Sequence, residues 1–111
     1  MEPNDAINVA NKMNLGLPML GTTSTPPDDD DYYRFKAPKS GDYEIILEYP
    51  DGNSIYFTVI EVIGNSYVEK GTFRGGYAKS YMSQGKEIVL QLDPYYTKGS
   101  VNYTLTINLV K

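Results

Sequence analysis

From Tyr32 to the end of the chain, apolar and polar residues alternate with a period of two, and short turn sequences interrupt the alternation. The pattern is clearest from Val101 to Leu109, where apolar residues at odd positions alternate with Asn and Thr. A period of two sends successive side chains to opposite faces of a strand. Such segments, separated by turns about every ten residues, are typical of an antiparallel β-sandwich.

The turn sequences divide this part of the chain into short strands. Pro50-Asp51-Gly52-Asn53 is the strongest hairpin signal, because glycine accepts a positive φ and aspartate bonds its own backbone. Residues 55–63 are apolar on both faces at their centre, as expected of a strand inside a sheet. Residues 66–84 are less regular, with Phe73, Tyr77 and Tyr81 as expected core anchors, and Pro94 is expected to end its strand.

The fold class predicted from this pattern is all-β. We expect an antiparallel, jelly-roll-like β-sandwich of seven to eight short strands over residues 14–111. Residues 1–13 are interpreted as an N-terminal linker, with a short helical turn over 5–13 that Asn4 or Asp5 would cap. The length of 111 residues is that of one domain.

Composition excludes several kinds of catalytic site. The chain contains no Cys and no His, so a disulfide framework, a thiol nucleophile, a zinc–thiolate site and a Ser-His-Asp triad are all ruled out. A glycoside hydrolase would need two carboxylates about 5–10 Å apart in a cleft, and no insertion that would form a cleft is visible. We therefore expect a protein without enzymatic activity.

Negative charge is concentrated at the start of the chain. The net charge is −4, and residues 1–31 hold six acidic residues and one basic residue. This balance argues against nucleic acid as a partner, because nucleic acid requires a clustered basic face. No apolar run has the length of a membrane span. No signal peptide precedes Glu2, so we expect either a cytosolic protein or a domain taken from a longer chain.

Two groups of oxygen-bearing side chains lie in this acidic part. Glu2, Asn4 and Asp5 form one group, and the run from Asp28 to Asp31 forms the other. Calcium prefers six to eight oxygen ligands of these kinds, and a bound cation would relieve the repulsion between the carboxylates. A hydrated acidic loop explains the same residues. The residues alone leave both readings open.

A resemblance to a known family connects these features. Four segments together resemble the bacterial pre-peptidase C-terminal domain. They are Glu2-Pro3-Asn4-Asp5, Asp28 and Asp31 before Tyr32-Tyr33-Arg34-Phe35, Ser40-Gly41-Asp42-Tyr43-Glu44-Ile45 and Asn102-Tyr103-Thr104-Leu105-Thr106-Ile107. The collagen-binding domains of clostridial collagenases look like a related branch. The resemblance covers nearly the whole chain. It implies a jelly-roll-like sandwich attached to a secreted protease or another exported protein.

The resemblance also implies a ligand set for calcium. The positions that correspond to calcium ligands in the collagenase branch are Glu2, Asn4, Asp5, Asp28 and Asp31, with Thr23 as a further oxygen donor. That branch presents collagen-binding tyrosines along and just after the strand that follows a Gly-Lys turn. Here Gly85-Lys86 leads into a strand without tyrosine, and Tyr95 and Tyr96 follow later.

The eleven tyrosines fall into two groups. Tyr33, Tyr43 and Tyr103 lie in the inward register and are predicted core residues. Tyr56, Tyr95 and Tyr96 are off-register or in loops and are candidate ligand-binding residues, because an exposed tyrosine offers flat contact area with one polar tip.

The functional prediction is a monomeric, extracellular, non-catalytic module of a secreted bacterial protein, with an attached catalytic domain that we expect to be a protease. The module would aid secretion or folding, or bind collagen, another matrix protein or another surface, with calcium as a stabilising ion. The alternative is a carbohydrate-binding sandwich that uses its exposed tyrosines on a polysaccharide.

Overall fold

The structure is a computed structural model that describes residues 11–23 and 31–110. These residues form nine strands and no helix. The strands are β1 (Asn11–Lys12), β2 (Met19–Thr23), β3 (Asp31–Lys36), β4 (Gly41–Glu48), β5 (Ser54–Ile63), β6 (Ser66–Phe73), β7 (Tyr77–Met82), β8 (Glu87–Tyr96) and β9 (Val101–Leu109).

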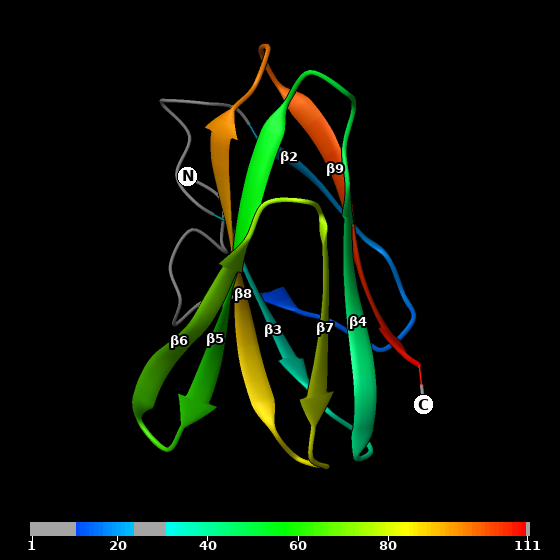
Figure 1. The fold of residues 1–111 in the computed structure, drawn as a ribbon, viewed down its shortest axis with the longest axis vertical. Coiled ribbons are helices and arrows are strands. Elements are labelled where there is room, and N and C mark those ends of the chain that lie inside the picture. Colours follow the sequence, from blue (N-terminus) through cyan, green and yellow to red (C-terminus); the bar gives the residue numbers. More distant parts are fainter. Residues whose placement is uncertain (1–10, 24–30, 111) are drawn as a thin grey trace.

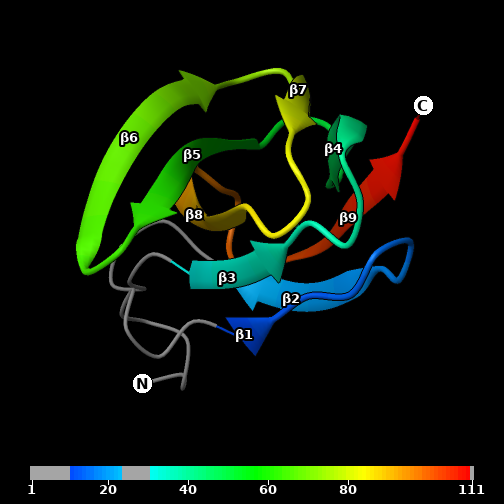
Figure 2. The same cartoon turned by 90° about the horizontal axis from the view of Figure 1, so that it is seen from below.

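The strands form two sheets that face each other, as Figures 1 and 2 show. One sheet has five strands in the order β1-β3-β8-β5-β6, and the other has four in the order β2-β9-β4-β7. All pairs are antiparallel except β1 with β3. The predicted β-sandwich is therefore confirmed, with nine strands in the described part rather than seven or eight.

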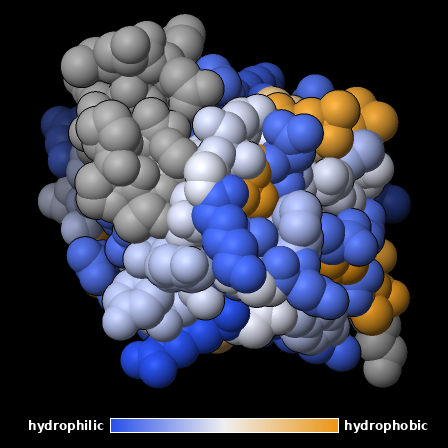
Figure 3. Space-filling view, turned by 90° about the horizontal axis from the view of Figure 1, so that it is seen from above, coloured by the Kyte–Doolittle hydropathy of each residue, from blue (hydrophilic) through white to orange (hydrophobic). Residues whose placement is uncertain are grey.

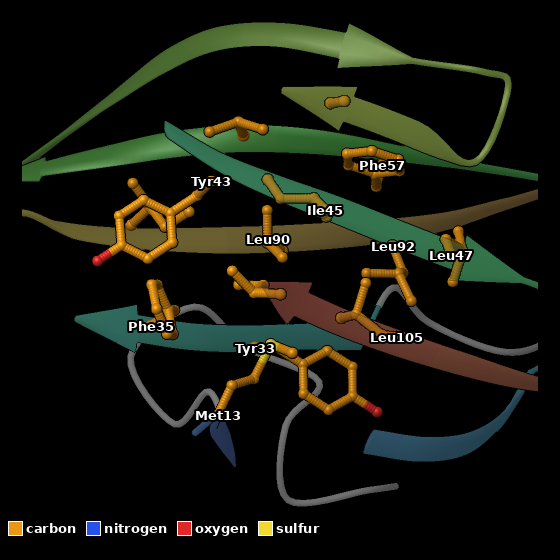
Figure 4. Close-up of a cluster of buried hydrophobic side chains, with 14 of the residues drawn as sticks. Met13, Tyr33, Phe35, Tyr43, Ile45, Leu47, Phe57, Leu90, Leu92 and Leu105 are labelled. Carbon is orange, nitrogen blue, oxygen red and sulfur yellow. The ribbon is translucent and has the colours of Figure 1, made fainter. Parts of the chain in front are cut away.

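The core lies between the sheets because alternate residues of each strand point inward. Figure 4 shows Phe35, Tyr43, Phe57 and Leu90 distributed along this layer. The described residues of the buried cluster are Met13, Tyr33, Phe35, Ala37, Tyr43, Ile45, Leu47, Ile55, Phe57, Val59, Ala78, Met82, Ile88, Leu90, Leu92, Tyr103, Leu105 and Ile107. The three tyrosines predicted as core residues are all among them.

Residues 13–18 connect the two sheets along one side of the sandwich (Figure 2). The amide of Met13 donates to the carbonyl of Arg34 at 2.7 Å, and the amide of Gly16 donates to the carbonyl of Ile107 at 2.8 Å. The first bond fixes the segment to the five-stranded sheet and the second fixes it to the four-stranded sheet. Met13 is therefore anchored at its backbone as well as buried.

The N-terminal segment differs from its predicted structure where it is described. Asn11–Lys12 is a strand that pairs with β3, so the helical turn expected over 5–13 does not include these residues, and residues 5–10 lie outside the described ranges. Pairing with β3 and burial of Met13 outweigh the weak local preference for a helix. The five-stranded sheet thus includes residues that the sequence interpretation gave to the linker.

Two other expectations are wrong. Strand β8 continues through Pro94 to Tyr96, because the register with β5 shifts between Ser54 and Ile55 and accommodates the proline. Tyr77 and Tyr81 are exposed rather than core anchors. Both lie on β7, the edge strand of the four-stranded sheet, with their side chains on its outer face.

Candidate functional site

Three side chains, two on neighbouring strands and one directly after a third strand, form a row on the outer face of the five-stranded sheet. The rings of Tyr56 and Tyr95 are stacked with their centroids 4.8 Å apart and their planes 10° apart. The guanidinium carbon of Arg74 lies 5.4 Å from the centroid of the Tyr56 ring. We call Arg74, Tyr56 and Tyr95 the aromatic row.

The order of the strands places Tyr56 in the middle of the aromatic row. Its strand, β5, lies between β6, which Arg74 directly follows, and β8, which carries Tyr95. A cation over a tyrosine ring and a parallel stack of two rings are both favourable contacts. Each contact restricts the rotamers of its partners, so the row is ordered before any ligand arrives, and this lowers the entropic cost of binding.

The row is open to solvent. Tyr95 is 64% exposed and Tyr96, the next residue, is 50% exposed, whereas Tyr56 is half-buried between its neighbours. Asp93 is also exposed and is the register partner of Tyr56 on β8. The structure thus brings together Tyr56 and Tyr95, two of the three candidate ligand-binding residues. Tyr96 is the Cα partner of Ser54 and has no described ring contact.

Sequence reasoning missed Arg74 and Asp93. Arg74 directly follows β6, which lies in the segment 66–84 that was read as irregular, so its place beside Tyr56 could not be recognised. Asp93 was overlooked because Pro94 was expected to end the strand. The alternation of the strand could have located Asp93, because Asp93 lies two and four residues after Gln91 and Val89 and so shares their face of the sheet.

The aromatic row lies near the end of the sandwich that carries the turns at residues 50–53 and 97–100 (Figure 1). The side chain of Asn53 ties these turns together, because its Oδ1 accepts the amide of Lys98 at 2.8 Å and its Nδ2 donates to the carbonyl of Pro50 at 2.9 Å. Seen from this end, the surface is largely hydrophilic or intermediate, and the strongly hydrophobic residues gather toward one side (Figure 3).

A second group of polar side chains is buried beside the acidic part of the chain. Tyr103 donates its hydroxyl proton to Oδ2 of Asp31 at 2.7 Å, so Tyr33 is the donor in the 2.6 Å bond between the two tyrosine hydroxyls. Burial, followed by the bonds to Tyr33 and Asp31, raises the pKa of Tyr103 far above its ordinary value. The proton therefore stays on Tyr103.

Of the residues implied as calcium ligands, the structure describes Thr23 and Asp31. Both are buried, and they flank residues 24–30. Thr23 pairs with Val101 at the start of β9, and the hydroxyl of Tyr103, two residues further along β9, reaches Asp31. A hydroxyl and a carboxylate are the hard oxygen donors that calcium takes, so this part of the donor set fits the ion.

The remaining implied ligands, Glu2, Asn4, Asp5 and Asp28, lie outside the described residues. Within residues 11–23 and 31–110, no three His, Cys, Asp or Glu side chains are grouped closely enough to hold a metal ion. The described ranges also contain no helix that is long and apolar enough to cross a membrane.

No protein-family model and no curated protein sequence matches the chain. Several solved structures share its fold. The pre-peptidase C-terminal domain of collagenase from Bacillus anthracis is 18% identical, with 88% of this chain and 93% of that chain covered and a TM-score of 0.63. The agreement with the family that the sequence resembles therefore lies at the level of the fold.

Two further similar structures have other roles. The Yersinia pseudotuberculosis-derived mitogen is 13% identical, with 84% of each chain covered and a TM-score of 0.66. A periplasmic inhibitor of g-type lysozyme from Aeromonas hydrophila is 12% identical, with 88% of this chain and 93% of that chain covered and a TM-score of 0.65. The sandwich is thus shared by proteins of different function, and function has to be argued from the surface.

Proposed function

We propose that this chain is a non-catalytic accessory module of a secreted bacterial protein, and that its aromatic row binds an extracellular polymer. The attached enzyme would be a protease. The fold shared with a C-terminal domain of a collagenase and the sequence resemblance support the accessory role. The observation that carries the binding role is the stacked pair of Tyr56 and Tyr95, with Arg74 against the ring of Tyr56.

The geometry of the aromatic row suits a repetitive ligand better than a compact one. The row extends from Arg74, directly after β6, across β5 to β8, and strands in a sheet are about 4.8 Å apart, so it presents an elongated line of side chains to a ligand. Tyrosine and arginine are the side chains that most often dominate binding energy at interfaces. A matrix protein such as collagen is the ligand that the resemblance to the collagenase branch suggests.

A polysaccharide is the second candidate, and the same row favours it for a different reason. The exposed ring of Tyr95 offers an apolar surface, Asp93 lies two residues earlier on β8 as a hydrogen-bond acceptor, and Arg74 supplies donors at the other end of the row. A sugar ring has apolar faces and hydroxyl edges, so it can stack on the tyrosine while its hydroxyls bond to the charged groups. The two candidates use the same residues and differ only in the polymer.

Cosedimentation with insoluble polymers tests the proposal. The protein would be mixed with collagen fibrils and, separately, with cellulose and chitin, and the bound fraction measured. We expect retention by one class of polymer, and we expect Tyr95→Ala to weaken it at least about tenfold, as loss of an aromatic anchor does. Tyr81→Ala is the matched control, because Tyr81 is also 64% exposed but lies on the other sheet.

The outcome separates the candidates. Binding to collagen that depends on Tyr95 supports a matrix-binding module, whereas binding to cellulose or chitin that depends on Tyr95 supports a carbohydrate-binding module. Equal effects of Tyr95→Ala and Tyr81→Ala, or no retention by any of the polymers, would count against the aromatic row as the binding site.

A stabilising role for calcium belongs to the same proposal. Thr23 and Asp31 would hold the ion together with Glu2, Asn4, Asp5 and Asp28. A bound calcium ion would neutralise the carboxylates of the acidic run and tie the N-terminal segment to residues 23–31. The buried position of Asp31 and its bond to Tyr103 support this arrangement, because they fix one carboxylate of the set.

A further inference from the structure

A pocket of about 520 Å³ lies at the end of the sandwich opposite the aromatic row. This size falls within the range of sites for small molecules. The pocket lies between the segment that follows β1, the end of β3 and the turn before β8. Its lining residues are Lys12, Met13, Asn14, Leu15, Phe35, Lys36, Ala37, Pro38, Gln84 and Gly85.

The walls of the pocket are held by backbone hydrogen bonds. The amide of Met13 donates to Arg34 at 2.7 Å, the amide of Ala37 donates to Lys86 at 2.8 Å, and the amide of Gly85 donates to Ala37 at 2.8 Å. Three separate segments are therefore locked to one another around the opening. The pocket is a built feature of the sandwich end, and a ligand would not have to order it.

The floor of the pocket is apolar. Met13, Phe35 and Ala37 are buried core residues whose edges reach the pocket, and Leu15 and Pro38 form exposed parts of its wall. Figure 4 shows Met13 beside Phe35 at the lower margin of the core. An apolar group placed here would be in contact with the hydrophobic core itself, which favours a hydrocarbon or aromatic body.

The rim of the pocket is positively charged. Lys12 and Lys36 are exposed, and neither forms an ion pair in the described part of the chain. The acidic residues nearest in the sheet are already engaged, since Glu87 bonds Arg34 at 2.9 Å and Glu61 bonds Lys86 at 3.0 Å. Within residues 11–23 and 31–110, the two lysines at the pocket therefore have no carboxylate in an ion pair with them.

A second hollow of about 430 Å³ adjoins the first and shares Lys36, Gln84 and Gly85 with it. Its other lining residues are mostly polar, namely Val62, Gly64, Ser83, Lys86 and Glu87. Lys36 thus stands between an apolar compartment and a polar one. This division matches a ligand that has an apolar body and a hydrated, charged head.

We propose that the pocket binds a small amphiphilic carboxylate, with its apolar body against Met13, Phe35 and Leu15 and its carboxylate beside Lys12 and Lys36. Two ammonium groups attract one carboxylate, while the apolar body gains from leaving water. The site lies away from the aromatic row and does not depend on what that row binds. It also needs no calcium.

Three probes separate the two parts of this recognition. Decanoate has both the apolar chain and the carboxylate, decyltrimethylammonium has the chain with the opposite charge, and acetate has the charge alone. In amide NMR titrations of the intact chain, we expect decanoate to shift the signals of residues 12–15, 35–37 and 84–85 with a Kd on the order of 1 mM. The other two probes should bind at least about tenfold more weakly.

Variants of the rim test the role of the lysines. Lys12→Gln and Lys36→Gln should each weaken decanoate binding about threefold, as expected for exposed ion pairs, and the double variant should weaken it about tenfold. Lys70→Gln is the matched control, since Lys70 is exposed on the edge strand β6. All three positions are on the surface, so these proteins should fold as the original does.

Several results would overturn the proposal. Equal binding of decanoate and decyltrimethylammonium would show a merely apolar surface, and shifts outside residues 12–15, 35–37 and 84–85 would place the ligand elsewhere. A final experiment measures cosedimentation of the protein with vesicles of anionic phospholipid and, as the reference, with neutral vesicles. Cosedimentation with the anionic vesicles, combined with no response to free decanoate, would replace the small carboxylate by a membrane surface.

Discussion

The hydroxyl of Tyr103 on β9 donates a 2.7 Å hydrogen bond to the carboxylate of Asp31 on β3. The two residues are 72 positions apart in the chain, and their strands belong to different sheets. The bond therefore joins the two layers of the sandwich at the residue that ends the acidic run. Because both groups are buried, neither can exchange this partner for water without opening the fold.

Tyr103→Phe should lower the free energy of unfolding by about 1.5–3 kcal/mol, the usual range for a buried hydrogen bond to a carboxylate. The variant keeps the ring and removes only the hydroxyl that connects Asp31 with Tyr33. Urea denaturation followed by circular dichroism measures the change. Tyr49→Phe serves as control, since Tyr49 packs against the core and its hydroxyl has no described hydrogen bond. A loss no larger than that of Tyr49→Phe would mean that the bond to Asp31 contributes little.

Stability should fall at alkaline pH in a way that depends on Tyr103. Its pKa is raised in the folded protein from an ordinary value of 10.0. Below pH 10 both states hold the proton, and above pH 10 the unfolded state loses it while the folded state keeps it. Unfolding is then favoured by up to about 1.4 kcal/mol for each further pH unit.

The measurement is the free energy of unfolding between about pH 9 and about pH 11, for the original protein and for Tyr103→Phe. Other tyrosines and the lysines contribute to both curves, so only the difference in slope above pH 10 is informative. The variant should have the shallower slope. Parallel curves would show that Tyr103 ionises as readily in the folded state as in the unfolded one.

Gly21→Ala should destabilise the fold strongly. A Cβ atom at Gly21 would lie 2.3 Å from Cζ of Tyr103, so the ring that bonds Asp31 would have to move. We expect a loss of about 2–3 kcal/mol, within the range for overpacked sites. Gly75→Ala is the control, because nothing lies within 4 Å of its added Cβ and its φ is not positive. Thermal melts of the two variants compare them, and equal melting temperatures would contradict the close packing of Tyr103 on Gly21.

Calcium should raise the melting temperature if the proposed site is filled. Extracellular modules bind calcium with a Kd of about 10⁻⁴ to 10⁻³ M, and a concentration ten times the Kd stabilises the folded state by about 1.4 kcal/mol. For a domain of this size the shift would be about 5 °C. The comparison is calorimetry in calcium and in EGTA, and Asp28→Asn should reduce the shift. Identical melting curves in calcium and in EGTA would contradict a stabilising role for calcium.

The sheet architecture could be predicted because it depends on a local pattern. The alternation from Val101 to Leu109 gives the inward face of β9 directly, and Leu105 and Ile107 are fully buried as that pattern requires. The same reasoning placed Tyr33, Tyr43 and Tyr103 in the core. It failed for Tyr77 and Tyr81, which have the spacing of core residues but lie on the outer face of an edge strand.

The details of the binding surface were less predictable, since they depend on which strands become neighbours. Tyr56 and Tyr95 could be named as candidate ligand-binding residues because they are off the inward register or expected in a loop. Their stacking, however, requires β5 and β8 to pair with a shifted register. Arg74 joins them only because β6 lies on the other side of β5. The pocket near Lys36 is likewise hidden from the sequence, because three distant segments form it.

The central claim is that the aromatic row is the binding face of this module. It is tested most directly by NMR of the tyrosine ring signals while a soluble fragment of the retained polymer is added, either a triple-helical collagen peptide or an oligosaccharide. We expect saturable shifts of Tyr56 and Tyr95 with no change at Tyr81, and loss of binding in Tyr95→Ala. Binding that leaves the rings of Tyr56 and Tyr95 unperturbed would contradict the claim.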